Sequence, residues 1–139
     1  MELVVDTNVF ISAIIKSSKT RELLCSPKLT LFAPEHIILE SLSNKEEILS
    51  KAGITDSEFA ELLAILLSKI NIFSKEEFYY LIDKALEIVK HEEDAPFLAL
   101  SLAKNIPMWS NDKELKEQSL VRVFSTEELI EYLAIKNLV

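Results

Sequence analysis

The chain has 139 residues, of which 49% are apolar and 27% charged, a composition typical of a folded globular protein rather than a disordered one. We expect one domain over residues 1–139. The formal net charge of −8 disfavours non-specific nucleic-acid binding by the whole surface, but it allows a local basic strip. The single glycine excludes glycine-rich phosphate loops, and the single cysteine favours a cytoplasmic location. No apolar run approaches the roughly 18 residues of a membrane span, so no membrane association is expected.

Short apolar runs of strand length alternate along the chain with longer segments of helical periodicity. In chain order, the pattern predicts a strand over 2–5, helices over 9–16 and 20–26, a strand over 29–33, helices over 34–52 and 57–69, a strand over 70–73, helices over 75–91 and 95–104, a strand over 106–109, a helix over 113–118, a strand over 121–124 and a helix over 127–136. Strands that alternate with helices form a mostly parallel sheet covered on both faces. The expected fold is therefore α/β, a three-layer α/β/α sandwich with a central sheet of four to five strands.

Several of the predicted helices begin or end at residues with a known capping chemistry. Pro34 suits the first turn of the helix predicted over 34–52, and Gly53 suits the position just after that helix. Thr55 and Glu58 have the spacing of a capping box, and Ser125 to Glu128 precede an apolar stripe in the same way. These signals place the predicted helix boundaries.

Four acidic residues fall at positions where a merely solvated acid is not expected. Asp6 directly follows the first predicted strand, and Asp112 follows the strand over 106–109. Asp94 opens the helix over 95–104, and Glu40 lies among apolar residues of the helix over 34–52. Because ligands of parallel sheets bind outside the carboxyl ends of the strands, at least Asp6 and Asp112 are expected on the functional edge.

Each acid also has a purely structural interpretation. Asp94 and Asp112 stand where helix N-caps stand, Thr7 or Asn8 is suited to cap the helix after Asp6, and Glu40 is suited to a boundary position with its carboxylate in water. Taken together, however, four carboxylates in one pocket repel each other and raise some of their pKa values unless a cation binds between them. Their oxygens are hard ligands that suit Mg²⁺ or Mn²⁺.

Four segments carry a resemblance to a known family. They are VVDTNVFISAII with Asp6, APEHIILESL with Glu40, DAPFLALSLAKN with Asp94, and IPMWSND with Asp112. In this order and at these spacings, the chain resembles the PIN-domain family of PilT N-terminus-like nucleases over essentially its whole length.

The resemblance implies a metal-dependent endoribonuclease that hydrolyses phosphodiester bonds of single-stranded or loop RNA. By analogy, Asp6, Glu40, Asp94 and Asp112 are the catalytic and metal-binding residues for one or two Mg²⁺ or Mn²⁺ ions, and Glu40 is either a ligand or the group that orients the attacking water. Asn8 and Ser110 resemble residues that hold these carboxylates by hydrogen bonds. RNA binding would then depend on basic residues near the motifs: Lys16, Lys19, Arg21, Lys104, Lys113 and Lys116.

Small members of this family that consist of one domain are often toxins of toxin–antitoxin pairs. By that resemblance, the expected partners are an RNA substrate, an antitoxin protein and a second copy of the chain in a homodimer.

Two other interpretations remain open. In the first, the protein is a catalytically inactive PIN-like scaffold or a module that binds RNA or protein. The overall acidity and the small number of cations favour this alternative. A zinc or iron site built from His36, Glu40 and His91 is a weaker alternative, because the sequence has no H-E-x-x-H or cysteine pattern.

Overall fold

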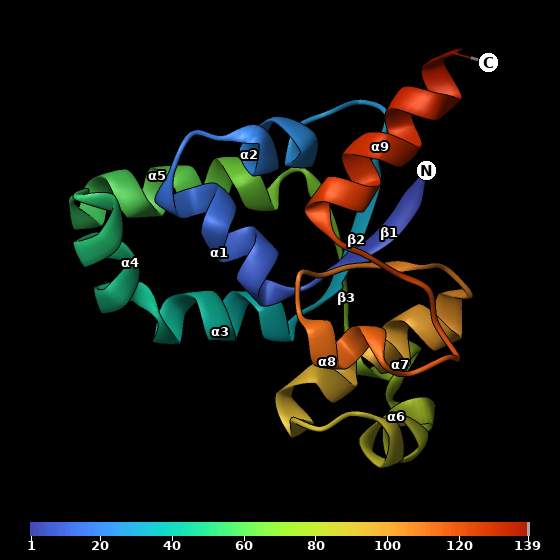
Figure 1. Ribbon diagram of the computed structural model, residues 1–139. Coiled ribbons are helices and arrows are strands. Elements are labelled where there is room, and N and C mark those ends of the chain that lie inside the picture. The colour runs from blue at the N-terminus through green and yellow to red at the C-terminus, as the bar shows by residue number, and fades with distance from the viewer. Residues whose placement is uncertain (139) are drawn as a thin grey trace.

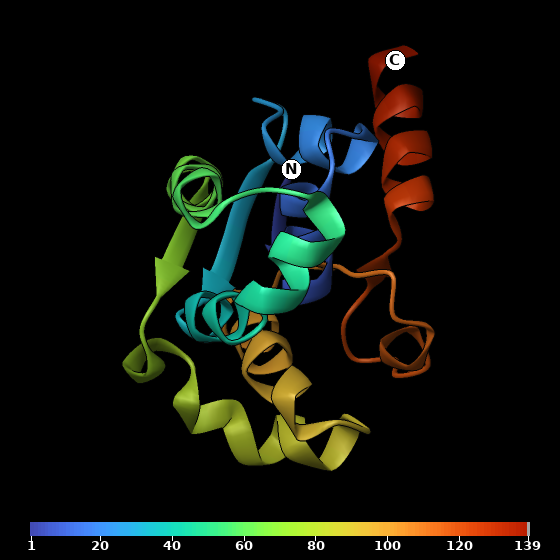
Figure 2. The ribbon, with the colours of Figure 1, turned by 90° about the vertical axis from the view of Figure 1, so that its left-hand side faces the viewer.

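Five short strands form one parallel sheet at the centre of the protein. The computed structural model describes residues 1–138, and in it the strand order is β3-β2-β1-β4-β5. The strands are β1 (Glu2–Val5), β2 (Thr30–Pro34), β3 (Ile70–Phe73), β4 (Met108–Trp109) and β5 (Val123–Phe124). Figure 2 shows β2 and β3 with their arrowheads at the same end of the sheet. The predicted parallel α/β sheet is confirmed, with all five strands in it.

Helices cover both faces of this sheet, as the predicted sandwich requires. The chain crosses from β1 to β2 through α1 (Thr7–Ile15) and α2 (Lys19–Leu24), and returns from β3 to β4 through α7 (Ala95–Lys104). Because these two crossovers run in opposite directions across the sheet, the right-handed rule places α1 and α7 on opposite faces (Figure 1). The last helix, α9 (Thr126–Leu138), lies beside α2.

The hydrophobic core lies between the central strands and these helices. The first seven residues of α7, 95–101, are all buried, and the helix packs across β1 and β2. Phe10 of α1 and Trp109 of β4 are among the largest side chains with no exposed surface. This packing makes the carboxyl ends of β1 and β4 a rigid platform.

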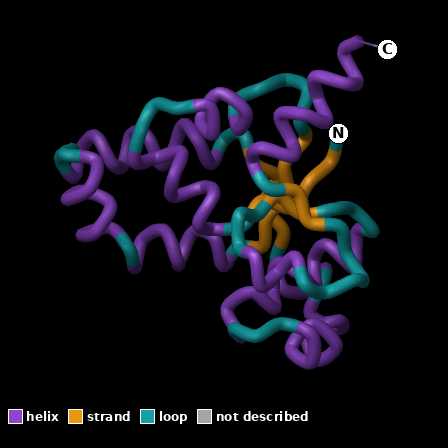
Figure 3. Tube along the Cα trace, viewed as in Figure 1, coloured by secondary structure: helices purple, strands orange, loops and turns teal. Residues whose placement is uncertain are grey.

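The helical region between β2 and β3 differs from the prediction. A single helix over 34–52 is wrong: Pro34 ends β2, and the chain then forms α3 (His36–Ser43) and α4 (Lys45–Ala52) with a break at Asn44. The Asn44 side chain donates to the carbonyl of Glu40 at 2.7 Å, and this competes with continuation of the helix. With α5 (Asp56–Leu67), these helices project from the sheet as an arm (Figure 3).

The signals at the turn from α4 to α5 are confirmed. Gly53 has φ 65°, a left-handed conformation that costs glycine little and that ends α4. The Thr55 hydroxyl accepts from the amide of Glu58 at 3.1 Å, and the Glu58 carboxylate accepts from the amide of Thr55 at 3.0 Å. Both halves of the capping box are therefore present.

The segment between β3 and α7 also differs from the prediction of one helix over 75–91. It forms two short 3₁₀ turns, η1 (Lys75–Glu77) and η2 (Tyr79–Leu81), then α6 (Ile82–Ile88) and a further turn, η3 (Glu92–Asp94). Phe78 lies between the first two turns with φ −142°, which is not helical, and its ring is fully buried. Burial of this ring therefore outweighs the local preference for a continuous helix.

None of the helices in the described part of the chain combines the length and apolar character needed to cross a bilayer.

Candidate active site

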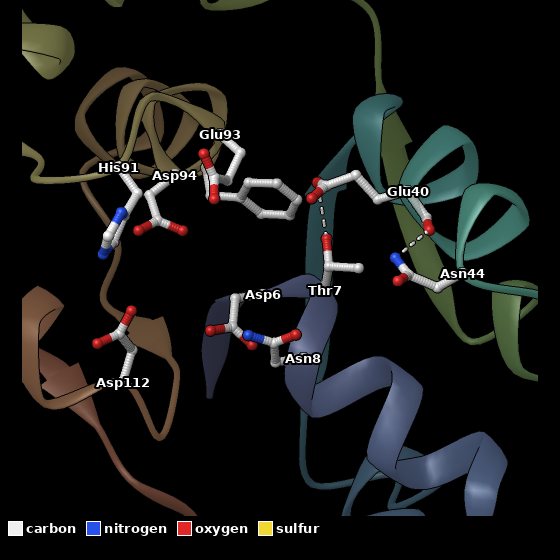
Figure 4. Close-up of a pocket in the computed structure, with 10 residues that line it drawn as sticks. Asp6, Thr7, Asn8, Glu40, Asn44, His91, Glu93, Asp94 and Asp112 are labelled. Atoms are coloured by element: carbon white, nitrogen blue, oxygen red, sulfur yellow. Dashed lines mark hydrogen bonds between the residues drawn. The ribbon is translucent and has the colours of Figure 1, made fainter. Parts of the chain in front are cut away.

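The acidic pocket lies where the order of the strands reverses. β1 and β4 are neighbours in the sheet, but β1 continues to β2 on one side while β4 continues to β5 on the other. In open α/β sheets this switch point leaves a crevice at the carboxyl ends of the two strands. A pocket of about 410 Å³ occupies it, and Asp6, Glu40, Asp94 and Asp112 all line it (Figure 4). The structure thus brings together the four acids that the sequence singled out.

Asp6 is the most firmly held of these acids. It caps α1 itself, because its Oδ1 accepts from the Val9 amide at 2.9 Å, so neither Thr7 nor Asn8 is the cap. Its Oδ2 accepts a hydrogen bond from the hydroxyl of Ser110. Only 6% of Asp6 is exposed, and this burial raises the pKa of its carboxyl against the opposing effect of the two hydrogen bonds.

Asp112 is held by the loop that follows β4. The Ser110 hydroxyl accepts from the amide of Asp112 at 3.1 Å while it donates to Asp6, so one serine links the two acids. Asp112 caps the short helix α8 (Lys113–Lys116), and its Oδ1 accepts from the Glu114 amide at 2.9 Å. The capping interpretation of Asp112 is therefore correct, and its second oxygen remains available to the pocket.

Asp94 occupies the N-cap position of α7 but makes no capping hydrogen bond. Its carboxylate points instead toward those of Asp6 and Asp112 (Figure 4). Burial, followed by the negative charges of Asp112, Asp6 and Glu93, raises its pKa to about 6. A carboxyl that is not tied to the helix end and that titrates near neutrality is available to bind a ligand.

Glu40 enters the pocket from α3. The Thr7 hydroxyl donates to its Oε1 at 2.9 Å, and Asn44 holds the backbone of the same residue. Partial burial raises the pKa of Glu40, the Thr7 hydrogen bond opposes this, and the charges of Glu93 and Asp6 add to the increase. The residue is therefore oriented toward the pocket rather than simply solvated.

The pocket has a strong negative charge that the protein itself does not neutralise. Glu93 adds a fifth carboxylate to the lining, and no lysine or arginine is among the lining residues. His91 lies at the rim, and its Nε2 is 2.9 Å from a carboxylate oxygen of Glu114. Uncompensated carboxylates of this kind fit a hard divalent cation, which would offset the burial and the neighbouring negative charge that raise the pKa values of Asp6, Glu40 and Asp94.

The carboxylates surround the pocket without forming a closed chelate. Within residues 1–138, no three acidic, histidine or cysteine side chains are close enough together to hold one ion directly. Magnesium typically keeps several of its waters and binds proteins through one or two carboxylates, so the spacing suits a hydrated ion. Asn8 lines the pocket but is exposed, and its side chain makes no hydrogen bond to a described residue.

Several pocket residues were not among the predicted site residues: Thr7, Asn44, His91, Glu93 and Phe97. Thr7 is adjacent to Asp6 in sequence, and Glu93 belongs to the acidic run before Asp94, so both carried a signal. The zinc or iron alternative gains nothing, because His36 lies in a neighbouring hollow and only His91 reaches the acidic pocket.

The basic residues expected to bind RNA are largely engaged elsewhere. Arg21 donates to the carbonyls of Ala13 and Ile14 at 2.7 and 3.0 Å and so caps the end of α1. Lys19, Lys104 and Lys116 form ion pairs with glutamates. These residues therefore have structural partners, and none of them lines the acidic pocket.

Comparison with known proteins identifies the family. A model of the PIN domain matches residues 4–134, which is nearly the whole chain. The chain belongs to the PIN-domain family. PIN domains are generally nucleases and typically depend on divalent metals, which supports a nuclease-type enzyme. The resemblance found in the four acidic motifs is therefore confirmed.

Solved structures share the fold of this PIN domain. A chain from the crystal structure of VapBC2 from Rickettsia felis, bound to a DNA fragment from the promoter, aligns with a TM-score of 0.67 and 20% identity over 90% of this chain and 98% of that one. PAE2754 from Pyrobaculum aerophilum aligns with a TM-score of 0.67 and 18% identity over 97% of this chain and 90% of that one. No curated protein matches the sequence significantly.

Proposed function

We propose that this PIN domain is a metal-dependent endoribonuclease that hydrolyses phosphodiester bonds of single-stranded or loop RNA. The observation that carries the proposal is the acidic pocket at the strand switch point, where four acids from four separate motifs converge without a neutralising lysine or arginine. A purely structural protein would gain nothing from such a site, because the mutual repulsion of the acids destabilises the fold.

Asp6, Glu40, Asp94 and Asp112 would hold one or two Mg²⁺ or Mn²⁺ ions. When bound, such an ion activates water, orients the phosphate and neutralises the charge that builds on the scissile group. The protein's own contribution is to place the ligands: Ser110 holds Asp6 and the backbone of Asp112, and Thr7 holds Glu40. Asn8, exposed at the pocket, is available to bond a carboxylate or a substrate oxygen.

We also infer a biological setting for the enzyme. The VapBC2 chain with the same fold comes from a complex bound to promoter DNA, which supports a toxin of a toxin–antitoxin pair with an antitoxin as partner. Leu42 of α3 and Ile65 of α5 are exposed, and such apolar residues suit a homodimer or antitoxin contact. We further propose a single domain over residues 1–139, since its strands form one sheet, and a cytoplasmic location.

An inactive scaffold is the second candidate. The net charge of −8 and the absence of a closed three-residue chelate within residues 1–138 favour it. In that case the protein would bind RNA or another protein at the same edge of the sheet without cleaving it.

A cleavage assay on a mixed RNA pool separates the two candidates. We expect cleavage with Mg²⁺ or Mn²⁺ and none with EDTA. We expect Asp6→Asn to abolish it, because loss of a ligand costs more than the roughly 10- to 100-fold typical of its supporting residues. The matched control is Asp83→Asn, the same chemical change at an exposed position of α6 outside the pocket.

Two outcomes would contradict this proposal. Cleavage that survives both EDTA and Asp6→Asn would place the active site elsewhere, and the absence of cleavage with every metal would favour the scaffold. The homodimer is tested separately by light scattering during size-exclusion chromatography, where a species of only 15.8 kDa would contradict it.

A further inference from the structure

A second hollow adjoins the acidic pocket on the side of α3 and α6. It has a volume of about 370 Å³ and shares Glu40 and Glu93 with the acidic pocket, so the two lie side by side. Figure 4 shows both glutamates in the lining of the acidic pocket. We name it the Tyr79 hollow after the aromatic residue in its lining. A ligand chain with one unit in the acidic pocket can therefore place the next unit in this hollow.

The Tyr79 hollow has an apolar part that is open to solvent, beside the charged side chains of Glu40, Glu92, Glu93 and Lys75. Leu39 is 67% exposed, Tyr79 is 52% exposed and Leu86 is 43% exposed, although all three line the same concave surface. Apolar side chains grouped in a hollow beside a functional site indicate a ligand with a flat, apolar face. Tyr79 in particular offers an aromatic ring on which a planar group can stack.

The same hollow carries a cation that is free to meet an anion. Lys75 lines it, forms no ion pair with any residue of the described range 1–138, and places its Nζ 5.6 Å from the centre of the Tyr79 ring. By contrast, four of the six cations near the acidic motifs have partners: Lys19, Lys104 and Lys116 form ion pairs and Arg21 bonds backbone carbonyls. An aromatic ring and an unpaired lysine at one edge are the two groups that single-stranded nucleic acid requires, for its bases and for its phosphates.

Another hollow that borders the acidic pocket lacks these groups. This hollow, between α1 and α4, shares Asn8 and Asn44 with the acidic pocket, but no aromatic residue lines it. Its lysine, Lys51, is already paired with Glu47 at 2.7 Å. The two hollows therefore differ in the chemistry they offer, and only the Tyr79 hollow combines a stacking surface with a free cation.

We propose that the Tyr79 hollow binds one nucleobase of a single-stranded RNA, next to the phosphodiester bond held in the acidic pocket, an inference that rests on the proposed ribonuclease function. The base stacks on Tyr79 against the apolar wall of Leu39 and Leu86. Lys75 binds the phosphate on the outer side of that nucleotide. Because every base has a flat face, this contact gives affinity while tolerating different sequences.

The test couples a change in the protein to a change in the RNA. Kinetics are measured on a short single-stranded RNA with one cleavage site, and on copies with an abasic nucleotide on either side of that site. Removal of the base on one side is expected to raise KM about tenfold with the native protein and less than twofold with Tyr79→Ala, since stacking contributes roughly 5- to 100-fold per base. kcat is expected to stay within about twofold, because Tyr79 does not touch the reacting atoms.

Two further variants keep the result interpretable. Tyr79→Phe retains the ring and is expected to behave as the native protein does. Tyr80→Ala is the matched control, because Tyr80 is 73% exposed, adjacent in sequence and outside the lining of the hollow. Thermal unfolding of all variants checks that they are folded.

A binding measurement without cleavage separates this proposal from the ribonuclease function itself. Fluorescence anisotropy of the same labelled RNA is followed with Asp6→Asn and with Asp6→Asn/Tyr79→Ala, and the second protein is expected to bind about tenfold more weakly. Equal effects of Tyr79→Ala and Tyr80→Ala in both assays would overturn the base site while leaving the nuclease intact. Loss of a dimer by Tyr79→Ala, with RNA binding unchanged, would instead identify the hollow as a protein interface and would also overturn it.

Discussion

The two walls of the acidic pocket hold their carboxylates in different ways. Asp6 and Asp112 follow strands, and each is fixed by hydrogen bonds from the backbone or from Ser110. Asp94 and Glu40 belong to helices. Asp94 makes no capping bond, and Glu40 has one side-chain hydrogen bond, from Thr7. The pair Asp6 and Asp112, which we call the strand wall, is therefore positioned by the sheet. The pair Asp94 and Glu40, which we call the helix wall, is less constrained and can respond to a ligand.

Because of this difference, the strand wall and the helix wall are expected to respond to different changes. The strand wall is continuous with the buried core of β1 and β4, so we expect its oxygens to keep their positions when a metal binds. On the helix wall, burial and neighbouring negative charge raise the pKa values of Asp94 and Glu40 with little hydrogen bonding to oppose the change. We expect mutations of the strand wall to damage activity through position, and changes of pH to act mainly through the helix wall.

The largest expected effect in this comparison is that of Ser110→Ala. It removes the hydroxyl that joins Asp6 to the backbone of Asp112, so metal-dependent cleavage should fall roughly 10- to 100-fold. Steady-state kinetics at saturating Mg²⁺ measure the loss. Ser41→Ala is the control, because Ser41 is also buried but bonds only the carbonyl of Ile37 in its own helix. Similar losses in both variants would show that Ser110 acts through stability alone.

At acidic pH, protonation of Asp94 on the helix wall should compete with metal binding and weaken it. Because Asp94 has a pKa of about 6, it is mostly ionised at pH 7.5 and mostly protonated at pH 5. Binding of Mg²⁺ requires the ionised form, so affinity should fall roughly tenfold between these pH values. Isothermal titration calorimetry measures it, and Asp94→Asn should flatten the profile. A native profile without any change across this range would contradict the assignment of Asp94.

A smaller effect is expected from Thr7→Val. The change removes the hydrogen bond to Glu40 but keeps the volume of the side chain, and water can replace the lost donor because Glu40 is only partly buried. Cleavage should fall about two- to fivefold, well below the loss for Ser110→Ala. If the two variants lose equal activity, the two walls are equally rigid and the comparison fails.

The smallest effect concerns stability without metal. The folded-state pKa of Asp94 lies above its ordinary value of 3.8, so the folded state binds the proton more tightly and stability falls as pH rises from about 4 through 6. At pH 7 in EDTA, Asp94→Asn should therefore raise the free energy of unfolding, by on the order of 1 kcal/mol once screening of this half-buried group is allowed for. Urea unfolding measures it. Mg²⁺ should then stabilise the native protein more than the variant.

Much of the architecture could be predicted because short stretches of the sequence determine it. The residues of β1, β3 and α7 were predicted with their observed bounds, since apolar runs of the right length leave few alternatives. The pattern of acids after strands likewise placed Asp6 and Asp112 on one edge of the sheet, because a parallel sheet brings the carboxyl ends of its strands together. The capping box at Thr55 and the turn at Gly53 are local in the same sense.

Tertiary contacts decided what local pattern could not. The break at Asn44 and the turns around Phe78 replace two long predicted helices, because a carbonyl partner and a buried ring outweigh helix propensity at those points.

The sequence by itself determined the parallel α/β fold and the four acids, because both depend on residue type and spacing along the chain. Only the tertiary structure decided that Ser110 joins Asp6 to Asp112, that Asp94 is released from its cap, and that Tyr79 and Lys75 border the acidic pocket. The reason is that these relations depend on distances between segments remote in sequence. Such distances follow from how the helices pack on the sheet, and no short window of residues contains them.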